Sequence, residues 1–473
     1  MKLTRTDLRT IPHRALHVPA GRERWSAAGV STDSRTVAPG DLYVALRGEK
    51  FDGHAFVRDV LARGAAGVVV DEQGAGALPQ DAIALVVEDT YAALRALAAL
   101  VRGRFTGPVI AVGGSNGKTT TKDMIARVLG TTKNVLCTEG NNNNHIGVPQ
   151  TIFRLTDTHD IAVVEVGTNY PGEVPLLRDV LQPTHVVITN VGREHLEFFG
   201  TVEGVAAEET TLWAKVPGGK EPVAFVNTDD ELLMHAARGR KRAVRYGTKL
   251  RTADVRGTRV QLTPEGGVQF RLAGKGITKP VDVLLQVPGE HAAIDALAAV
   301  AVGLTLRVPV KRIVEALGGF TASSKRMEVV RAHGVTILND TYNANPDSML
   351  AALRTLAAYP ADGKRIAVLA DMLELGEAAA AEHEKIGQAT AAMGVDHLLT
   401  YGKLGALIAR ASGSKQAIAY EQKNILAEYL LELLAPGDVV LVKGSRGMRM
   451  EDVVIFLQER GAAAERRKNE VNA

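Results

Sequence analysis

VIAVGGSNGKTTTKDM, residues 109–124, decides the fold of this chain. Its first four residues, Val109–Val112, are apolar and predict a short buried strand. A glycine-containing loop follows, and a helix is expected from Lys118 onward. Such a loop lets backbone N–H groups surround phosphate oxygens, while a lysine adds positive charge and a threonine hydroxyl can ligate Mg²⁺. The sequence therefore predicts a protein that binds a nucleoside triphosphate.

The loop departs from the strict Walker A pattern, because the first glycine of GxxxxGK[ST] would fall at Val112. The motif present is GxxGKTT. A chance glycine turn before a helix is the alternative, and the order of strand, loop and helix disfavours it. The residues expected to bind the nucleotide are Gly114, Ser115, Asn116, Gly117, Lys118, Thr119 and Thr120.

Length and composition indicate a multidomain enzyme. The 473 residues suggest about three domains at roughly 150 residues each. The formal net charge of +3 gives no reason to expect nucleic acid or a membrane surface as a partner. The single cysteine, Cys137, excludes an internal disulfide and suits a reducing compartment. Since no apolar leader or membrane-spanning run is evident, we expect a soluble cytoplasmic protein. We also expect a monomer.

The pattern of strands and helices divides the chain into three expected domains, residues 1–103, 104–320 and 321–473. In the first, strands at 41–46 and 67–70 alternate with helices at 55–63 and 90–102, and residues 103–108 are the expected linker. In the second, further strands are expected at 161–166, 185–189 and 223–226. Residues 245–287 alternate polar and apolar side chains and predict an antiparallel excursion, followed by a helix at 291–304.

The third region again alternates strands and helices. Strands are expected at 335–338, 366–370, 397–401 and 439–442, which predicts a second parallel sheet. The tail, residues 461–473, is expected to be frayed. The overall fold class is therefore α/β, with a central P-loop parallel-sheet domain and a Rossmann-like C-terminal domain.

Two polar side chains follow strands of the predicted central sheet. Glu165 stands near the end of one strand, and His195 comes shortly after the next. Ligands of doubly wound sheets bind beyond the carboxyl ends of the strands, where the glycine loop also opens. Glu165 could therefore complete an Mg²⁺ site begun by Thr119. A solvated charge at Glu165 and a structural role for His195 are the alternatives.

Six segments occur in order along the chain: Thr32–Arg35 with Val37–Leu46 and Asp52–His54; Gly114–Thr119; Gly140–Pro149; Glu165–Asn169 with His195–Glu197; Asn339–Pro346; and Lys443–Gly447. Taken singly, several could be ordinary turns or helix caps. Together they resemble the Mur ligase family over nearly the whole chain. The forms GNNNNHIGVP and YNANP favour the branch of this family that adds D-alanyl-D-alanine.

This resemblance implies three α/β domains around a cleft and an ATP-driven amide bond formed through an acyl phosphate. The implied substrates are UDP-N-acetylmuramoyl-tripeptide and D-alanyl-D-alanine, with Mg²⁺ as cofactor. The implied catalytic residues are Lys118, Glu165, His195 and Arg326. Asp340 and Asn345 are expected to contact the nucleoside. The implied substrate contacts are Ser34, Arg35, Asn141, Asn143, Asn144, Lys443, Ser445 and Arg446.

Two positions depart from the family pattern. Many members carry a lysine that reacts with CO₂ to give a metal-supporting carbamate, and Glu209 stands at that position here. We expect Glu209 to supply a permanent carboxylate, making the metal set Thr119, Glu165, His195 and Glu209; a solvated helix glutamate is the alternative. In the pattern GxHNxxNALA, Ala292 and Asp295 replace the two asparagines. His291 and Asp295 remain expected nucleotide contacts.

Two other functions stay open at this point. A related ligase that adds a different amino acid, including a folate polyglutamate-type ligase, would share the fold and the phosphate loop. A silent nucleotide-binding or scaffold protein would be expected to lack Lys118, Glu165 or His195, and all three are present.

Overall fold

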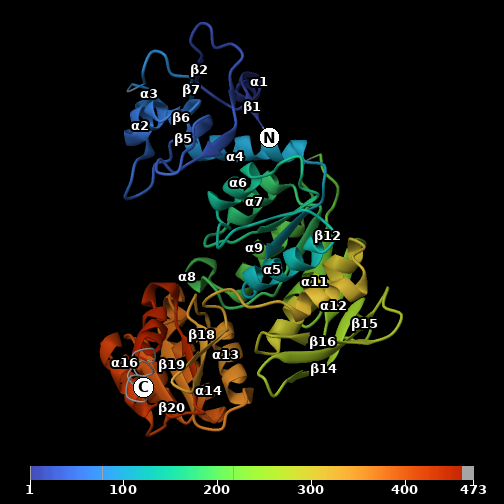
Figure 1. Cartoon of the computed structure of the whole chain (residues 1–473), viewed down its shortest axis with the longest axis vertical. Helices are drawn as coiled ribbons and strands as arrows, with labels where there is room; N and C mark the ends of the chain where they lie inside the picture. Colours follow the sequence, from blue (N-terminus) through green and yellow to red (C-terminus); the bar gives the residue numbers. More distant parts are fainter. Residues whose placement is uncertain (1, 77, 217, 461–473) are drawn as a thin grey trace, which may run out of the picture.

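The computed structural model describes residues 2–76, 78–216 and 218–460. Figure 1 shows three α/β domains in chain order along the long axis of the molecule. The strands of each domain form their own main sheet. The fold class expected from the sequence is confirmed. The expected frayed tail, residues 461–473, lies outside the described residues.

The N-terminal domain contains a five-stranded sheet in the order β2-β7-β6-β5-β4 and a separate β1-β3 pair. Pairing within the larger sheet is parallel except between β2 and β7. Its elements are β1 (Leu3–Thr4), α1 (Arg5–Thr10), β2 (Ala15–His17), β3 (Ser26–Ala27), β4 (Gly29–Ser31), β5 (Asp41–Val44), η1 (Gly53–Phe56), α2 (Val57–Ala62), β6 (Gly67–Asp71), α3 (Glu72–Ala75), β7 (Ala84–Val87) and α4 (Thr90–Arg104).

Helix α4 extends two residues beyond its expected end and forms part of the connection to the central domain. Arg102, which is buried, donates from Nε to the carbonyl oxygen of Leu181 and from Nη2 to that of Gln182. The last turn of α4 is therefore tied to the C-terminal end of α7, and the linker shortens to the residues after Arg104.

The central domain holds a nine-stranded sheet in the order β16-β15-β14-β13-β12-β11-β8-β10-β9. Its elements are β8 (Val109–Gly113), α5 (Lys118–Gly130), β9 (Val135–Cys137), α6 (Gly147–Phe153), β10 (Ile161–Glu165), α7 (Glu173–Leu181), β11 (His185–Ile188), α8 (Leu196–Phe199), α9 (Val202–Thr210), η2 (Thr211–Trp213), β12 (Val223–Asn227), α10 (Glu231–Ala236), β13 (Ala243–Gly247), β14 (Val255–Leu262), β15 (Val268–Gly274), β16 (Val281–Leu285), α11 (His291–Thr305) and α12 (Val310–Gly318).

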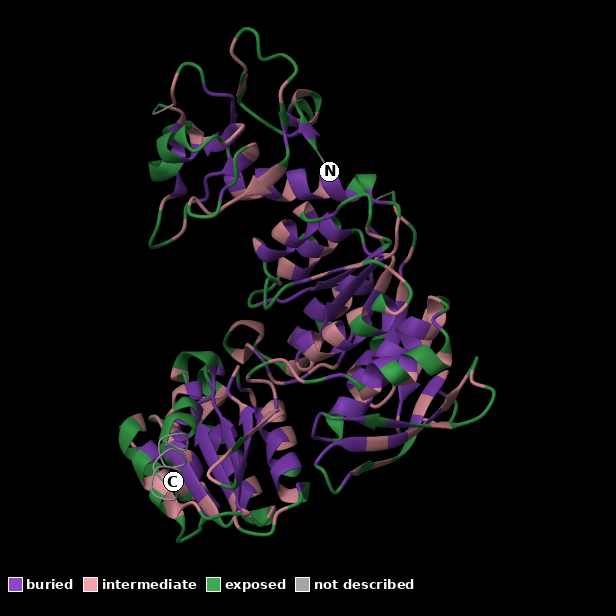
Figure 2. Ribbon diagram, in the orientation of Figure 1, coloured by how far each residue is buried: buried purple, intermediate pink, exposed green. Residues whose placement is uncertain are grey.

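Strands β8 to β13 are parallel to their neighbours, and β14, β15 and β16 pair antiparallel with one another. The expected antiparallel excursion is thus confirmed, and it extends the main sheet. The buried strands form the interior of the domain (Figure 2), with α5 and α11 packed together on one face. Helix α11 is Ala-rich, and it packs against both α5 and strands β12 to β15, where small side chains allow close packing.

The C-terminal domain has a six-stranded sheet in the order β17-β18-β22-β19-β20-β21. The expected parallel sheet is confirmed, because the four expected strands, β18, β19, β20 and β22, pair in parallel. Two strands were not expected: β21 adds a parallel edge, and β17 pairs antiparallel with β18 as a hairpin. The elements are β17 (Glu328–Ala332), β18 (Val335–Asp340), α13 (Pro346–Ala358), β19 (Arg365–Ala370), η3 (Gly376–Ala378), α14 (Ala379–Ala392), β20 (His397–Tyr401), α15 (Gly405–Ser412), β21 (Ala417–Tyr420), α16 (Lys423–Leu433), β22 (Val439–Lys443) and η4 (Arg446–Met448).

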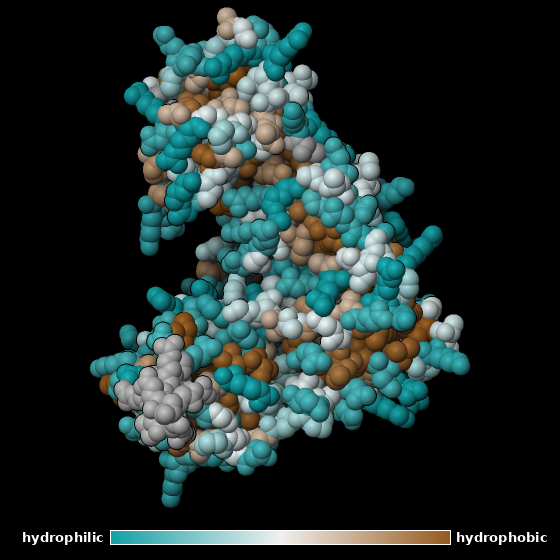
Figure 3. All heavy atoms as spheres, in the orientation of Figure 1, coloured by the Kyte–Doolittle hydropathy of each residue, from teal (hydrophilic) through white to brown (hydrophobic). Residues whose placement is uncertain are grey.

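The surface is hollowed between the N-terminal and C-terminal domains, and hydrophilic side chains predominate around this hollow (Figure 3). Among the helices that the structure describes, none is both long and apolar enough to cross a membrane.

Candidate active site

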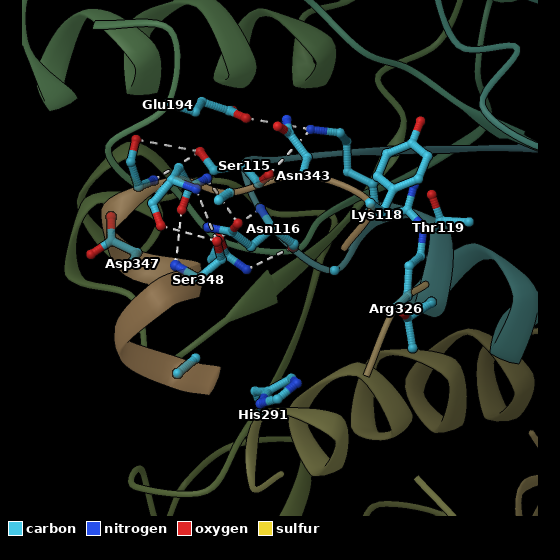
Figure 4. Close-up of a pocket in the computed structure, with 18 of the residues that line it drawn as sticks. Ser115, Asn116, Lys118, Thr119, Glu194, His291, Arg326, Asn343, Asp347 and Ser348 are labelled. Atoms are coloured by element: carbon cyan, nitrogen blue, oxygen red, sulfur yellow. Dashed lines mark hydrogen bonds and ion pairs between the residues drawn. The ribbon is translucent and has the colours of Figure 1, made fainter. Parts of the chain in front are cut away.

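A cavity of about 1190 Å³ opens where the central and C-terminal domains meet. The phosphate loop and the carboxyl ends of β10 and β11 line one side of it. The N-terminal turns of α11 and α13 and the loop after β22 line the other. The sheet topology explains the central part, because parallel strands bring all their carboxyl ends to one edge. Figure 4 shows side chains from both domains converging there.

Two glycines shape the phosphate loop. Gly114 has a φ of 108° and Gly117 a φ of 78°, which other residues rarely adopt. A Cβ on Gly114 would lie 2.4 Å from Thr189 Oγ1 and 2.7 Å from the backbone nitrogen of the same residue. The sequence therefore needs glycine here both for conformation and for space. The following helix, α5, begins at Lys118 and directs its free N–H groups into the loop.

Lys118 is held among carbonyl oxygens and carboxylates. Its Nζ donates to the carbonyl oxygens of Gly114 (2.5 Å) and Ser115 (3.3 Å) and lies 3.6 Å from Glu194 Oε2. Figure 4 shows Glu194 and Lys118 pointing toward one another. Burial lowers the pKa of the Lys118 amine, but nearby carboxylates, Glu194 foremost, outweigh it and raise that pKa overall. Lys118 is therefore a fixed cation beside the phosphate loop.

Glu165 is buried at the end of β10. Its Oε1 accepts a hydrogen bond from Asn143 Nδ2 at 2.8 Å, whereas its Oε2 is buried with no partner among the described residues. Asn143 thus orients the carboxylate that the sequence analysis assigned to the metal. The neighbouring Asn144 has a different task, because its Oδ1 accepts from the backbone N–H groups of Ile146 and Gly147. Together with Asn141, both asparagines line the cavity.

Glu209 lies directly beneath the phosphate loop. It is fully buried, and its Oε2 accepts the backbone N–H of Gly114 at 2.8 Å, while Oε1 has no partner among the described residues. Burial raises the pKa of the Glu209 carboxyl to about 7, against the lowering effect of Lys118. A solvated surface position for Glu209, the alternative kept open from the sequence, is wrong.

The donor set fits a magnesium ion. Around the phosphate loop, four residues have a buried oxygen with no hydrogen-bond partner among the residues described: Thr119, Glu165, Glu194 and Glu209. Hard oxygen donors of this kind suit Mg²⁺, which binds through one or two carboxylates together with phosphates and water. Within the described residues, no group of three or more His, Cys, Asp or Glu side chains could hold a metal alone.

His195 lies at the domain boundary. Its φ is 49°, and its Nδ1 is 2.7 Å from Oε2 of Glu374 in the C-terminal domain. The bond to His195 lowers the pKa of the Glu374 carboxyl. The expected metal residue therefore has one ring nitrogen paired with the other domain, which leaves Nε2 for a ligand. The sequence analysis did not assign a role to Glu194 or Glu374. Glu194 could have been found, because it is an acidic residue between a strand end and His195.

His291 and Asp295 line the cavity at the start of α11, as expected for nucleotide contacts. Burial lowers the pKa of His291, and it raises the pKa of Asp295 to about 8. Asp295 Oδ1 accepts from Thr121 Oγ1 at 3.0 Å and would lie 2.6 Å from a Cβ on Gly117. Asp295 thus supports the phosphate loop from behind, a contact that the sequence did not predict.

The C-terminal domain contributes a cation and an amide to the cavity. The Arg326 guanidinium stacks on the Tyr342 ring, 3.7 Å from its centroid, and both residues line the cavity. Asn345 caps α13 by accepting from the backbone N–H of Ser348, and its Nδ2 donates to Asn116 Oδ1 at 2.9 Å. The YNANP motif therefore touches the phosphate loop directly.

The expected acceptor residues separate into two kinds. Lys443 and Ser445 are buried: Lys443 Nζ binds Asp340 Oδ2 at 2.5 Å, and Ser445 Oγ donates to the carbonyl oxygen of Ala344. These bonds hold the strand ends together. The side chains of Lys443, Ser445 and Asp340 are therefore bonded to other residues of the C-terminal domain. Arg446 is more exposed, with its Nη1 2.7 Å from Glu451 Oε1, and can turn toward a ligand.

Ser34 and Arg35 do not line this cavity. They lie in the N-terminal domain, where the exposed Arg35 side chain pairs with Asp33 at 2.7 Å and holds the pKa of that carboxyl at about 2. The resemblance implied that this first domain, residues 1–103, holds the UDP-sugar end of the substrate, which would place Ser34 and Arg35 away from the phosphate loop. A ligand that reaches both places must therefore be long.

Comparisons with known proteins cover all three domains. Residues 26–102 match the family model described as Mur ligase family, catalytic domain; residues 112–303 match the Mur ligase middle domain; residues 325–446 match the Mur ligase, glutamate ligase domain. The UDP-N-acetylmuramoyl-tripeptide–D-alanyl-D-alanine ligase of Escherichia coli K12 is 38% identical over 91% of this chain and 94% of its own length. The enzyme of the same name from Bacillus subtilis is 36% identical over 91% and 93%.

Solved structures agree. A crystal structure of MurF from Acinetobacter baumannii has a TM-score of 0.87 at 31% identity, covering 97% of this chain and 99% of that one. MurF ligase from Thermotoga maritima in complex with ADP has a TM-score of 0.82 at 27% identity, covering 92% and 98%. The expected family is confirmed: this chain belongs to the Mur ligase family, in the branch of the UDP-N-acetylmuramoyl-tripeptide–D-alanyl-D-alanine ligases.

Proposed function

We propose that this chain is an ATP-dependent ligase that joins D-alanyl-D-alanine to UDP-N-acetylmuramoyl-tripeptide, giving the pentapeptide precursor of peptidoglycan. One observation carries the proposal. A single cavity combines a phosphate loop, buried carboxylates with free oxygens, and cations from a second domain. Relatives above 30% identity over most of the chain are named for this reaction.

The first step activates the carboxylate at the end of the tripeptide. One of its oxygens attacks the γ-phosphorus of ATP, the bond from that phosphorus to the bridging oxygen of ADP breaks, and an acyl phosphate forms. Lys118 and Arg326 neutralise the charge that spreads over the transferred group, which is the main task in phosphoryl transfer. The N–H groups at the start of α5 add to this stabilisation.

The second step forms the amide. The amine of D-alanyl-D-alanine attacks the acyl carbon, the C–O bond to phosphate breaks, inorganic phosphate leaves, and the nitrogen loses a proton. We assign Arg446 to the dipeptide carboxylate, since it lines the cavity and its side chain is more exposed than those of Lys443 and Ser445. Alignment of the two reactants supplies most of the rate gain in such a step.

Magnesium is the cofactor that the donor set fits. Thr119 and Glu165 would hold one ion and His195 would help to hold a second, with Glu209 beneath the loop. When bound, Mg²⁺ neutralises phosphate charge and fixes the phosphate geometry. The chain's own residues orient these ligands, as Asn143 does for Glu165.

The test is phosphate release from Mg-ATP with UDP-muramoyl-tripeptide and each of several acceptors. We expect release only with D-alanyl-D-alanine, together with a pentapeptide product by mass spectrometry. Release with L-Ala, D-Glu or diaminopimelate instead would assign the chain to a sister ligase. A Lys118→Ala variant, expected to lose about 10²–10³ in rate, checks that the signal comes from this site. We also propose that the protein acts in the cytoplasm as a monomer.

We further propose that Glu209 is an encoded carboxylate at the position where many Mur ligases build a carbamate. Its full burial and its free Oε1 beside Lys118 support this role. We expect the activity of the wild type to be the same in CO₂-depleted buffer and in added bicarbonate. A Glu209→Lys variant should gain bicarbonate dependence, because a lysine there needs CO₂ to become anionic. A wild type that depends strongly on bicarbonate would contradict the proposal.

A further inference from the structure

Residues 192–197 form a segment of the central domain that contacts the C-terminal domain; we call it the 192–197 segment. It follows β11 and leads into α8, and α8 packs against η3 of the C-terminal domain. Figure 1 shows α8 beside that domain. Of this segment, the sequence analysis singled out only residues 195–197, so Arg193 had no assigned role.

Arg193 binds two carboxylates of the other domain. Its backbone N–H donates to Asp347 Oδ2 at 2.7 Å, and its Nη2 donates to Asp347 Oδ1 at 2.5 Å. Its Nη1 donates to Glu382 Oε2 at 2.7 Å. The Glu382 side chain is only 7% exposed and that of Arg193 24% exposed. Charge-assisted bonds in a forked arrangement like this are strong and set orientation as well as energy.

The 192–197 segment also holds the phosphate loop. The backbone N–H of Gly192 donates to Ser115 Oγ at 2.8 Å. Asn190, just before the segment, accepts the N–H of Asn116 and donates to its carbonyl oxygen. On its other side, Asn116 receives the bond from Asn345 at the start of α13. The phosphate loop, the segment and the first turn of α13 are therefore one hydrogen-bonded unit that crosses the domain boundary.

A second contact crosses the boundary two residues further on. His195 and Glu374 are paired, and both have left-handed backbones, with φ of 49° and 63°. The backbone N–H of Glu197 donates to the carbonyl oxygen of Glu374 at 3.2 Å. Residues other than glycine adopt this conformation at a cost that the surrounding structure must offset. Arg193 supplies ionic contacts next to this strained pair.

We propose that Arg193 is a positioning residue for the ligase reaction: its bonds to Asp347 and Glu382 fix the C-terminal domain so that Arg326 and Arg446 share one cavity with Lys118. This inference rests on the proposed ligase function. The reacting carboxylate, phosphate and amine must align across the two domains, and a displacement of about 1 Å can cost on the order of 10² in rate. Arg193 does not line that cavity and acts through the domain that it holds.

The experiment combines kinetics with an inter-domain distance. Variants Arg193→Ala, Asp347→Ala and the double variant form a mutant cycle, and Arg193→Lys keeps the charge without the fork. Arg410→Ala is the matched control, because Arg410 pairs with Glu384 on the exposed surface of one domain. To measure the inter-domain distance, one dye is attached in the central domain at Glu203→Cys and one in the C-terminal domain at Lys415→Cys, both exposed sites. A Cys137→Ser background leaves these as the only two thiols, and the energy transfer between the dyes is recorded.

We expect Arg193→Ala to lower kcat/KM for the dipeptide at least tenfold and to change the energy transfer, while the control stays within twofold in both. The double variant should lose less than the sum of the two single losses, since both substitutions remove the bonds between the Arg193 guanidinium and Asp347. The kcat/KM of Arg193→Lys should lie between those of the wild type and Arg193→Ala. An Arg193→Ala variant with near-normal kcat/KM, or one that loses activity with unchanged energy transfer, would overturn the proposal.

Two measurements separate this proposal from other causes of lost activity. Thermal unfolding shows whether a variant is folded, and Asp347→Asn, which keeps the shape and removes the charge, should reproduce the change in energy transfer. If the wild type itself forms no pentapeptide, the ligase function fails. The energy-transfer arm still decides in that case whether Arg193 sets the domain arrangement.

Discussion

At the scale of single residues, the buried acids around the phosphate loop have different tasks. Glu165 and Glu209 each have one buried oxygen without a partner among the described residues, whereas Asp295 accepts a hydrogen bond from Thr121 through Oδ1. Burial raises the pKa of the Asp295 carboxyl to about 8. An acid that stays protonated at neutral pH avoids placing a bare charge behind the loop, and this has a measurable consequence for stability.

We predict that Asp295→Asn makes the protein more stable at pH 8 than the wild type, and that the difference vanishes near pH 4. Between the unfolded pKa, about 4, and the folded value of about 8, the folded state keeps a proton that the unfolded state has lost. The contribution of Asp295 to stability therefore falls as pH rises through that window. The gain in Tm at pH 8 should be on the order of 5 °C.

Differential scanning calorimetry of the ligand-free protein across pH 4–8 measures this effect. Asp282→Asn removes a carboxylate from an exposed position on β16 and serves as the control, with no comparable trend expected. A constant difference between Asp295→Asn and the wild type at all pH values would show that Asp295 is ionised when folded.

At the scale of elements, the site depends on how two helices begin. Helix α5 starts directly from the phosphate loop, and α13 starts from the YNANP motif with Asn345 as its cap. The two starts meet at the Asn116–Asn345 contact. Side-chain caps are recognisable in a sequence, but the partner of a capping residue in another domain is not.

We predict that Gly114→Ala abolishes ATP binding, because its Cβ would clash with Thr189 and the φ of 108° is strained for alanine. Gly130→Ala is the matched control: it lies in the last turn of the same helix, α5, and a Cβ there has open space. Isothermal titration with a nonhydrolysable ATP analogue distinguishes them. Gly114→Ala with wild-type affinity would mean that the loop changes shape on binding.

The strands that were predicted correctly have a sequence pattern in common. Strands β10 and β22 are continuous apolar runs that end in polar residues, and β8 is an apolar run that ends in glycine, so their positions and end residues follow from the pattern. The roles of Lys443 and Ser445 could not be predicted, because a strand-end cation looks the same whether it faces a ligand or Asp340. Arg193 escaped notice for a related reason: its partners lie 154 and 189 positions away.

At the scale of the whole molecule, the residues that we assign to the proposed substrates lie in different domains. The cavity joins the central and C-terminal domains, whereas Ser34 and Arg35 lie in the N-terminal domain and outside it. Contacts between the first two domains include the Tyr91–His145 ring pair, with centroids 5.4 Å apart. A substrate that spans these domains should draw them together and exclude water from the acyl phosphate.

We predict that UDP-muramoyl-tripeptide and a nonhydrolysable ATP analogue together reduce the radius of gyration more than either alone. Small-angle X-ray scattering measures this directly. The analogue alone should act on the central and C-terminal domains, because only these line the cavity. Superposable scattering curves with and without both ligands would contradict closure.

The thiol of Cys137, the single cysteine, is expected to be unreactive. Cys137 ends β9 and is partly buried, and burial raises the pKa of its thiol to about 11. Only the thiolate reacts readily, and at pH 7 about one molecule in ten thousand carries it. Peroxide and alkylating agents should therefore leave cysteine chemistry in this protein almost untouched, so a cell under oxidative attack would not lose this enzyme by that route.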